Sequence, residues 1–405
     1  MSLDILFLGK LFPREKEREI KEKMKTGMQD AANALQWNII DGLEANDFGQ
    51  MKIINYLPVD AYPKGYTDKF IEGFIFQHTE SYKADDINVK CCNIFGVKRF
   101  INSFYFKKHI KNWAKKDTGN KKIILSYTAN SMFLGLVKLA KKYNKNIIAG
   151  CIIADIPQFV TANEVRGIKK LYHKYQVEKC ASLYKYVDRF VLLTEQMAQK
   201  LNIKSPYIVV EGIATTDEIS VGNTKADALK NDRYILYSGT LNYKFGIGVL
   251  LDAFEKINDD NLKLVICGFG EAEKLIKEKQ DSRIVFLGRV DRADVLALQK
   301  NATVLVNPRQ NNEEFTKYSF PSKNLEYLSS GVPLVAYKLD GIPDEYDDFI
   351  TYPLDDSASE LAKEIVKICT MSDDERLALG LKAKNFVIQN KNKVNQARKI
   401  IELVE

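Results

Sequence analysis

Residues 234–257 read YILYSGTLNYKFGIGVLLDAFEKI, and this stretch decides the fold class. It begins with an apolar run over 234–238, continues through a loop of small and polar residues, and ends in a segment with helical periodicity over 246–257. A buried strand that leads through a glycine-containing loop into a helix is the repeating unit of parallel α/β sheets. The stretch therefore predicts a parallel sheet flanked by helices.

The same alternation continues outward over most of the chain. In the first half we expect strands at 4–8, 52–55, 121–127, 146–153, 189–193 and 207–210, and helices at 29–43, 131–143, 167–186 and 195–201. In the second half we expect strands at 234–238, 263–267, 283–287, 303–307 and 334–337, and helices at 246–257, 271–278, 292–300, 322–329 and 358–370. Each half therefore predicts its own doubly wound, Rossmann-like sheet.

A polar stretch over 215–232 separates the two halves and is interpreted as the linker. We expect an N-terminal Rossmann-like domain over 1–215, a C-terminal one over 216–384, and a terminal helix over 385–405 that could pack back on the first domain. Ligands of such sheets bind at the carboxyl ends of the strands, so the two sheets are expected to face a central cleft.

The net charge is uneven along the chain. The 405 residues carry 60 Lys and Arg against 53 Asp and Glu, a net charge of +7, with 45% hydrophobic and 28% charged residues. This composition excludes collagen, coiled coils, disordered chains and polytopic membrane proteins. Residues 1–215 hold 34 basic and 22 acidic side chains, whereas 216–405 hold 26 and 31. Two halves of opposite sign predict different partners, one of them anionic.

The six cysteines show neither disulfide-framework nor zinc-ligand spacing. The N-terminus lacks a signal-peptide pattern, and the longest apolar run, 147–154, is too short for a bilayer. We therefore expect a cytoplasmic protein, or one attached peripherally to the inner face of the cytoplasmic membrane. No Asp-x-Asp cluster follows a strand, so no metal and no cofactor are expected.

Three successive strands of the second half end in small-residue loops. The first contains Gly239, Thr240 and Lys244, the second Gly268, and the third Leu287, Arg289 and Val290. Backbone N–H groups at a loop that opens a helix favour a phosphate, and a lysine adds charge. The alternative is a set of plain turns with a solvated lysine, because glycine often serves the turn alone.

The segment YSFPSKNLEYLSSGVP over 318–333 is the strongest local signal. It predicts a short helix that begins near Pro321 with Ser322 as N-cap and ends at Gly331. Its N-terminus would place Ser322 and Lys323 at the crevice, and Glu326 on the same face could accept hydrogen bonds from vicinal hydroxyls. Alternatively, Glu326 is a surface helix residue.

These motifs, in this order, resemble retaining nucleotide-sugar glycosyltransferases of family 4, of the GT-B fold and bacterial polysaccharide type, over residues 231–390. The resemblance implies that the second domain binds a UDP- or GDP-sugar and the first domain the acceptor. It implies that Lys244 contacts the diphosphate, Glu326 the ribose and 287–290 the base. Ser322 with Lys323 would lie where the phosphates and the sugar meet, and Ser319, Phe320 and Pro321 of the same motif are further expected donor-binding residues.

The sequence departs from this family pattern at three places. Tyr318 stands where the family commonly has a first glutamate, and Thr240 replaces an arginine of the first phosphate loop, for which Arg309 or Lys323 could substitute. Tyr127 stands where a first-domain histidine is often found. The three histidines, His78, His109 and His173, are expected at the surface.

Three further residues of the first half lie at positions suited to substrate contact. Gly9 and Asp155 follow expected strands, and Gly27 precedes an expected helix. We expect Gly9 and Gly27 beside the donor. Asp155 is the best carboxylate for substrate hydroxyls, although it could also be a turn residue before Pro157.

Residues 98–122 carry nine basic side chains and one acidic one. As a helix, this segment places Phe106, Ile110 and Trp113 on one face. A basic amphipathic helix suits an anionic membrane surface, and the expected membrane contacts are Lys107, Lys108, Lys111, Trp113 and Lys115. A solvated helix with its apolar face in the core is the alternative. No nucleic-acid-binding signature accompanies the charge.

Together these features predict a metal-independent enzyme that transfers a sugar from a nucleotide diphosphate donor to an acceptor hydroxyl with retention. The expected catalytic residues are Asp155, Tyr127, Lys244 and Glu326. The resemblance and the basic surface favour a lipid-linked saccharide acceptor in capsule, exopolysaccharide or lipopolysaccharide synthesis. Alternatives are a GT-B sugar-nucleotide epimerase and a non-catalytic partner of another transferase, which the missing glutamate and arginine favour.

Overall fold

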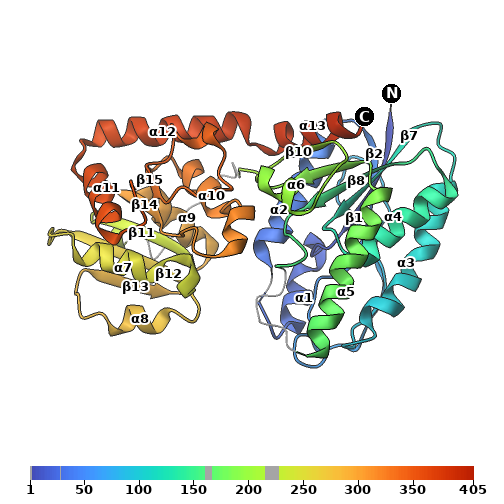
Figure 1. Ribbon diagram of the computed structural model, residues 1–405, viewed down its shortest axis with the longest axis horizontal. Helices are drawn as coiled ribbons and strands as arrows, with labels where there is room; N and C mark the ends of the chain where they lie inside the picture. The colour runs from blue at the N-terminus through green and yellow to red at the C-terminus, as the bar shows by residue number, and fades with distance from the viewer. Residues whose placement is uncertain (1, 28, 160–166, 215–227) are drawn as a thin grey trace. The chain divides into compact units, whose positions relative to one another are not determined.

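The computed structural model describes residues 2–27, 29–159, 167–214 and 228–405 (Figure 1). The chain forms two compact units, unit 1 with Met1–Glu211 and Lys393–Glu405, and unit 2 with Gly212–Asn392. Each unit is built around its own sheet. The expected linker, 215–232, lies mostly outside the described residues.

Unit 1 holds an eight-stranded sheet in the order β10-β9-β8-β7-β1-β2-β5-β4, parallel except for the β4–β5 pair, and a separate two-stranded pair, β3–β6. Its strands are β1 (Leu3–Gly9), β2 (Gly49–Asn55), β3 (Phe70–Ile71), β4 (Phe74–Phe76), β5 (Asp86–Asn88), β6 (Cys91–Cys92), β7 (Lys121–Tyr127), β8 (Ile148–Ile153), β9 (Arg189–Leu192) and β10 (Tyr207–Val209). Its α-helices are α1 (Glu17–Lys23), α2 (Asp30–Ala45), α3 (Lys98–Lys115), α4 (Ser131–Tyr143), α5 (Ile168–Leu183), α6 (Glu195–Lys200) and α13 (Lys393–Val404).

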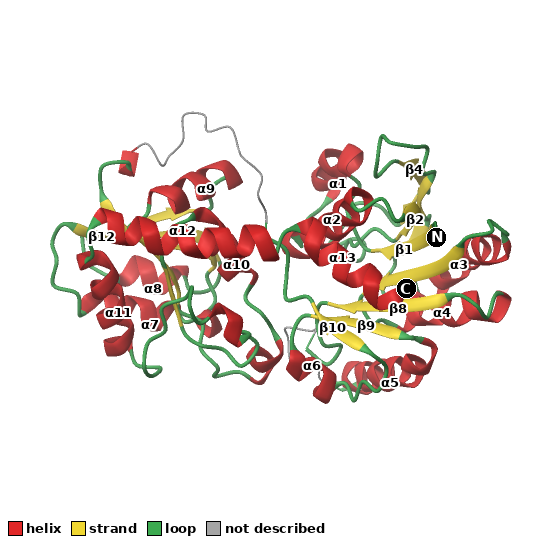
Figure 2. Cartoon of the chain, turned by 90° about the horizontal axis from the view of Figure 1, so that it is seen from above, coloured by secondary structure: helices red, strands yellow, loops and turns green. Residues whose placement is uncertain are grey.

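Helices cover both faces of this sheet, as Figure 2 shows. The helices α3, α4 and α5 pack in series on one face, and α13 packs against α2 and the strands β8 to β10 on the other. Successive strand residues point to opposite faces. Accordingly Ala149 of β8 joins the apolar cluster under α3 and α4, whereas a Cβ at the next residue, Gly150, would lie 3.2 Å from Val404 of α13.

Unit 2 holds a five-stranded parallel sheet in the order β13-β12-β11-β14-β15. Its strands are β11 (Arg233–Thr240), β12 (Leu262–Phe269), β13 (Ile284–Gly288), β14 (Val304–Asn307) and β15 (Leu334–Ala336). Its α-helices are α7 (Ile247–Glu255), α8 (Glu273–Glu278), α9 (Arg292–Asn301), α10 (Ser322–Ser330), α11 (Ala358–Thr370) and α12 (Asp373–Asn390). The strand order reverses between β11 and β14, which is the switch point where doubly wound sheets bind ligands.

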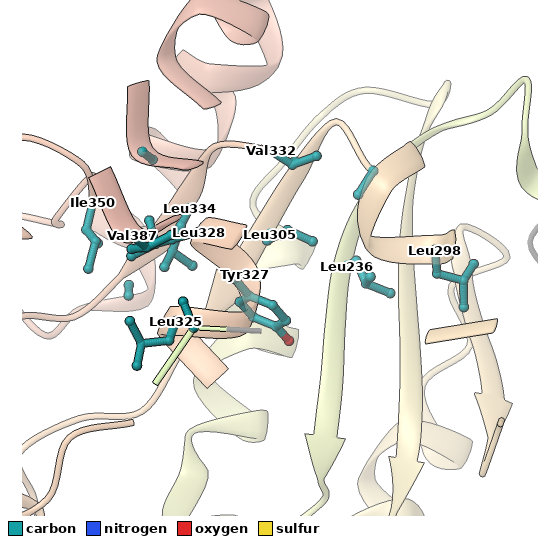
Figure 3. Packing of buried hydrophobic residues seen from close by; sticks show 14 of the residues in the cluster. Leu236, Leu298, Leu305, Leu325, Tyr327, Leu328, Val332, Leu334, Ile350 and Val387 are labelled. Atoms are coloured by element: carbon teal, nitrogen blue, oxygen red, sulfur yellow. The ribbon is translucent and has the colours of Figure 1, made fainter. Parts of the chain in front are cut away.

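The core of unit 2 has two apolar layers, one on each face of the sheet. Leu236 and Leu305 face a cluster that includes Leu298 of α9 and Leu328 of α10 (Figure 3). The alternate strand residues, such as Ile235, face a second cluster with residues of α7, α8 and α11. The predicted α/β class with two Rossmann-like units is therefore confirmed.

Two further expectations can be compared with the described residues. The six cysteines are buried and form no disulfide. Within the described part of the chain, no helix is long and apolar enough to cross a bilayer.

Candidate functional site

The first loop at the carboxyl edge of the unit 2 sheet is fixed by its own residues. After β11, the Asn242 side chain accepts a hydrogen bond from the Lys244 N–H at 2.9 Å, and a 3-10 turn over Tyr243–Phe245 leads into α7. Gly246 has φ +81°, and a Cβ there would lie 1.9 Å from the carbonyl oxygen of Pro308. Glycine is therefore required where this loop approaches the end of β14.

The second loop contains glycines with a structural reason of their own. Gly268 has φ +145°, and a Cβ on it would lie 1.8 Å from the carbonyl oxygen of Gly239. A Cβ on Gly270 would lie 2.3 Å from the carbonyl oxygen of Leu241. These glycines let the loops after β11 and β12 touch, which accounts for them without a ligand.

Two lysines border these loops. Lys244 is about half exposed, and its Nζ lies 3.3 Å from Glu313 Oε2. Lys323 is the second residue of α10, and its Cε would lie 3.5 Å from a Cβ at Gly239. Lys323 therefore lies against the first loop.

Arg309 follows β14 and lies beside the same loop. Its guanidinium is 5.3 Å from the ring centroid of Phe245 and 5.0 Å from that of Phe315, and its Nη2 donates to Ser319 Oγ at 2.8 Å. Its Nε is buried without a hydrogen-bond partner, and no carboxylate of a described residue forms an ion pair with it. Burial lowers the pKa of Arg309 to about 10. An anion bound beside this guanidinium would offset the free-energy cost of burying its charge.

Glu326 of α10 is largely buried, with 16% of its side chain exposed. Its Oε2 accepts from Arg292 Nη1 at 2.8 Å, and its Oε1 accepts from Gln299 Nε2 at 2.6 Å and lies 3.3 Å from Lys323 Nζ. Burial favours the neutral acid, but Lys323, Arg292 and Gln299 outweigh it and hold the pKa of Glu326 at about 2. Glu326 is therefore an ionised acceptor and not a plain surface residue.

The start of α10 differs from the prediction. Pro321 occupies the N-cap position and no side chain caps the helix, so Ser322 is the first helical residue and not the N-cap. Ser322 is exposed, which leaves N–H groups of the first turn available at the helix N-terminus. The Phe320 ring is buried against Tyr346, with centroids 5.2 Å apart, so its side chain belongs to the core.

The third loop pairs a cation with an aromatic ring. Arg289 is exposed after β13, and its guanidinium lies 5.0 Å from the ring centroid of Phe269, which is 50% exposed at the end of β12. Leu287 and Val290 pack on the core. Sequence reasoning missed Phe269, although an aromatic residue between two glycines was a usable signal.

In unit 1, the expected residues at the strand ends form no hydrogen-bonded cluster among the described residues. Tyr127 at the end of β7 is buried, and its hydroxyl forms no hydrogen bond with any residue that the structure describes. Desolvation raises the pKa of this hydroxyl. Asp155 follows β8; desolvation raises the pKa of its carboxyl, and Lys10 opposes this rise. Gly9 ends β1 beside Asn55, and Gly27 lies exposed with open space around its Cβ position.

The expected membrane helix corresponds to α3, with one correction. Phe106, Ile110 and Trp113 are buried, and Trp113 Nε1 donates to Asp4 Oδ1 at 2.8 Å. Trp113 is therefore a core residue and was wrongly expected to contact a membrane. The four lysines 107, 108, 111 and 115 are exposed, and among the described residues none of them has a carboxylate partner.

His78 is a second correction, because its side chain is fully buried. Its Nδ1 lies 2.6 Å from Asp86 Oδ2 and its Nε2 lies 3.1 Å from Glu44 Oε1. Burial opposes the imidazolium, but the two carboxylates raise the pKa of His78 to about 9. This cluster joins α2 to β5 in unit 1. Over the described residues, no group of three or more His, Cys, Asp or Glu side chains is placed to hold a metal.

Known proteins resemble part of this chain in sequence and nearly all of it in fold. Residues 232–371, about a third of the chain, match the family described as "Glycosyl transferases group 1". A search of the curated proteins by sequence found no relative. Solved structures match over nearly the whole chain at low identity.

Three of these structures illustrate the likeness. Sucrose-phosphate synthase from Thermosynechococcus elongatus is 16% identical, with 100% of this chain and 98% of that one covered and a TM-score of 0.63. The Escherichia coli trehalose-6-phosphate enzyme bound with UDP-2-fluoro glucose is 12% identical, with 98% of both chains covered and a TM-score of 0.63. Anabaena HepE in complex with UDP is 15% identical, with 99% of both chains covered and a TM-score of 0.60. The chain therefore has a GT-B-type fold, and the family match supports a glycosyltransferase.

Proposed function

We propose that the protein is a retaining, family 4 glycosyltransferase that moves a sugar from a nucleotide diphosphate donor to an acceptor hydroxyl. One observation carries the proposal: groups suited to a base, a ribose and a diphosphate gather at the carboxyl edge of the unit 2 sheet. Phe269 and Arg289 lie at the ends of β12 and β13, and Lys244 and Arg309 follow the neighbouring strands β11 and β14. Glu326 of α10 contacts Arg292 and Gln299 of α9, the helix that follows β13.

The transfer requires stabilisation of the charge that develops on the leaving diphosphate. Lys244, Lys323 and Arg309 supply three cations, and the uncapped N-terminus of α10 adds a partial positive charge. These groups support chemistry that does not depend on a metal. Asp155 and Tyr127 of unit 1 are proposed to contact substrate hydroxyls.

The donor is proposed to be a UDP-sugar, with a GDP-sugar as the alternative. Support comes from the HepE complex with UDP and from the trehalose-6-phosphate enzyme bound with UDP-2-fluoro glucose. The proposed acceptor is a lipid-linked saccharide in bacterial capsule, exopolysaccharide or lipopolysaccharide synthesis. It fits a protein that works at the cytoplasmic face of a membrane.

A non-catalytic nucleotide-sugar-binding partner of another transferase is the second candidate. Tyr318 and Thr240 favour it, because they stand where the family has a glutamate and an arginine. Arg309 counters this argument, since it brings a cation to the first loop from the neighbouring strand end.

The test is calorimetric titration of the protein with UDP and GDP, followed by nucleotide release from UDP- and GDP-sugars. Binding that is lost in Lys244→Ala and Glu326→Ala, together with release stimulated by a saccharide acceptor, is the expected result. Failure of both nucleotides to bind would refute the transferase proposal. Binding without turnover on any lipid-linked acceptor would favour the non-catalytic candidate.

We also propose that α3 carries the membrane contact. In the part of the chain that the structure describes, the four exposed lysines have no carboxylate partners. Phe104, 70% exposed, lies beside Lys107, with the ring centroid and the ammonium nitrogen 5.9 Å apart. By contrast, the two lysines of α8, Lys274 and Lys277, lie 3.5 and 3.1 Å from glutamates four residues away. An unneutralised basic row with an exposed aromatic ring suits an anionic bilayer.

Vesicle co-sedimentation tests this surface. Each lysine near anionic headgroups contributes about 1 kcal/mol, so changing Lys108, Lys111 and Lys115 to glutamine is expected to weaken binding to phosphatidylserine-containing vesicles on the order of 100-fold. The matched control changes three exposed, paired lysines, Lys274, Lys277 and Lys363, to glutamine. Equal loss in both triple variants would show that net charge, and not α3, determines binding.

A further inference from the structure

A buried glutamine, Gln299, donates a hydrogen bond to the carboxylate of Glu326. Gln299 lies on α9, is completely buried, and donates from Nε2 to Glu326 Oε1 at 2.6 Å and to Ser238 Oγ at 3.2 Å. No described residue forms a hydrogen bond with the side-chain carbonyl oxygen of Gln299. A buried amide with an unsatisfied acceptor is unfavourable for stability, so its presence requires an explanation.

The hydrogen bonds continue from Gln299 into β11 and α10. Ser238 Oγ lies 3.2 Å from the Tyr327 hydroxyl, which accepts from the Ser238 N–H at 2.8 Å and donates to the Ser238 carbonyl at 3.1 Å. Figure 3 shows this hydroxyl pointing toward the strand that carries Leu236, within the apolar cluster. Three secondary-structure elements therefore fix the position of the Gln299 amide.

The two oxygens of Glu326 have different surroundings. Oε1 is held by the buried Gln299, whereas Oε2 is paired with Arg292, whose side chain is 56% exposed. A long exposed side chain can rotate away from its partner at small cost, but a buried amide in a three-element network cannot. Oε2 is therefore the oxygen that a ligand can reach by displacing Arg292.

We propose that Gln299 is a positioning residue that orients the Glu326 carboxylate for a vicinal diol. This inference rests on the proposed function, because the diol is the ribose of the nucleotide donor. A carboxylate held in one orientation binds two adjacent hydroxyls without first losing rotational freedom. Gln299 does not touch the ligand and acts through Glu326.

The experiment measures discrimination for the diol. UDP and 2′,3′-dideoxy-UDP are titrated into the wild-type protein, with GDP and its dideoxy analogue in parallel. We expect the dideoxy compound to bind about 10-fold or more weakly, as is typical when hydrogen bonds to a charged group are lost. In Gln299→Met, which keeps the side-chain length and removes the amide, the ratio of the two dissociation constants is expected to fall toward 1.

The matched control is Tyr234→Phe. The Tyr234 hydroxyl is buried and donates to the Leu298 carbonyl of the same helix, α9, at 2.7 Å, so the variant loses a comparable buried hydrogen bond without touching Glu326. Tyr234→Phe is expected to keep the wild-type ratio. If Gln299→Met does not fold, Ser238→Ala, which removes the hydroxyl that holds the amide, is expected to lower the ratio part of the way.

Each outcome decides the question. A reduced ratio in Gln299→Met or Ser238→Ala, with an unchanged ratio in Tyr234→Phe, supports the positioning role. A wild-type ratio in all variants overturns it while the proposed function stands. If the wild-type protein binds the nucleotide and its dideoxy form equally well, both the positioning role of Gln299 and the assignment of Glu326 to the ribose are refuted. If it binds no nucleotide, the proposed function and this inference fail together.

Discussion

Replacing Arg309 with methionine is expected to weaken nucleotide binding and, at the same time, to stabilise unit 2. Methionine keeps an apolar chain between Phe245 and Phe315 but removes the charge and the hydrogen bond to Ser319. The substitution changes affinity and stability in opposite directions, because the buried guanidinium destabilises the free protein but attracts a bound anion. If Arg309 served packing alone, its replacement would lower the stability of unit 2 and leave nucleotide affinity unchanged.

The magnitude follows from the pKa of Arg309. Burial lowers it from 12.5 to about 10, a drop that corresponds to about 3 kcal/mol of destabilisation while the guanidinium stays charged in both the folded and unfolded chain. Loss of the hydrogen bond to Ser319 offsets about 1 kcal/mol, and loss of the contacts with the two rings about another 1 kcal/mol. The free energy of unfolding is therefore expected to rise by about 1 kcal/mol, or about 2–4 °C in Tm.

Two assays check this prediction. Calorimetry is expected to show UDP or GDP binding weakened about 10-fold or more, as for a lost charge-assisted contact, while calorimetric unfolding of the free protein shows the higher Tm. Lys244→Met is the comparison, because Lys244 is exposed and should weaken binding without raising Tm. An Arg309→Met protein with lower Tm and unchanged nucleotide affinity would refute the reasoning.

Three other predictions concern single side chains. Glu326→Gln should weaken nucleotide binding about 10-fold. Because the pKa of Glu326 is held at about 2, the wild-type preference for UDP over 2′,3′-dideoxy-UDP should stay constant from pH 8 down to pH 5, and a ratio of dissociation constants that changes with a midpoint above pH 5 would contradict this. His78, whose pKa is raised to about 9 chiefly by Asp86, should stabilise unit 1 fully below pH 6.5 and lose this effect as pH rises through 9. His78→Gln should therefore lower Tm at pH 7 and lower it less at pH 9.5. A difference in Tm between the variant and the wild type that does not change with pH would show that the imidazolium charge is not the source of the stability. Gly246→Ala should destabilise unit 2 by more than about 1 kcal/mol in urea, because its Cβ meets the Pro308 carbonyl, whereas Gly248→Ala, in open space, should not.

The sequence allowed the main architecture to be predicted because long buried strands of a parallel sheet are continuous apolar runs. The strands β7 and β11 were expected within two residues of their ends. The short strands β3 to β6 were missed, since two or three residues carry no periodicity. Trp113 was misassigned because an apolar helix face predicts burial against something but does not say whether that partner is a core or a membrane.

The proximity of candidate site residues could be predicted where those residues are close in the sequence. It could not be predicted where the fold brings together residues that are distant in the sequence. Lys323 and Glu326 lie three residues apart in one motif, so their proximity follows from helical spacing. Gln299 comes from another helix, and a glutamine in an amphipathic segment is ordinarily read as solvent-facing. Only the packing of α9 against β11 reveals that it is completely buried against Glu326.

Under the proposed function, the strand order lets Arg309 compensate for a departure from the motif of the family 4 glycosyltransferases that the sequence resembles. Thr240 lacks the charge that the family commonly has in the first loop, and by sequence this is a loss. Because β14 is the neighbour of β11 in the sheet, Arg309, which follows β14, lies beside the loop after β11. Its guanidinium lies near the rings of Phe245 and Phe315 there. The position of a cation at a strand end, and not its place in a motif, determines which charge it can stabilise. The absence of an arginine at 240 is therefore weak evidence against catalysis, and the non-catalytic candidate rests chiefly on Tyr318.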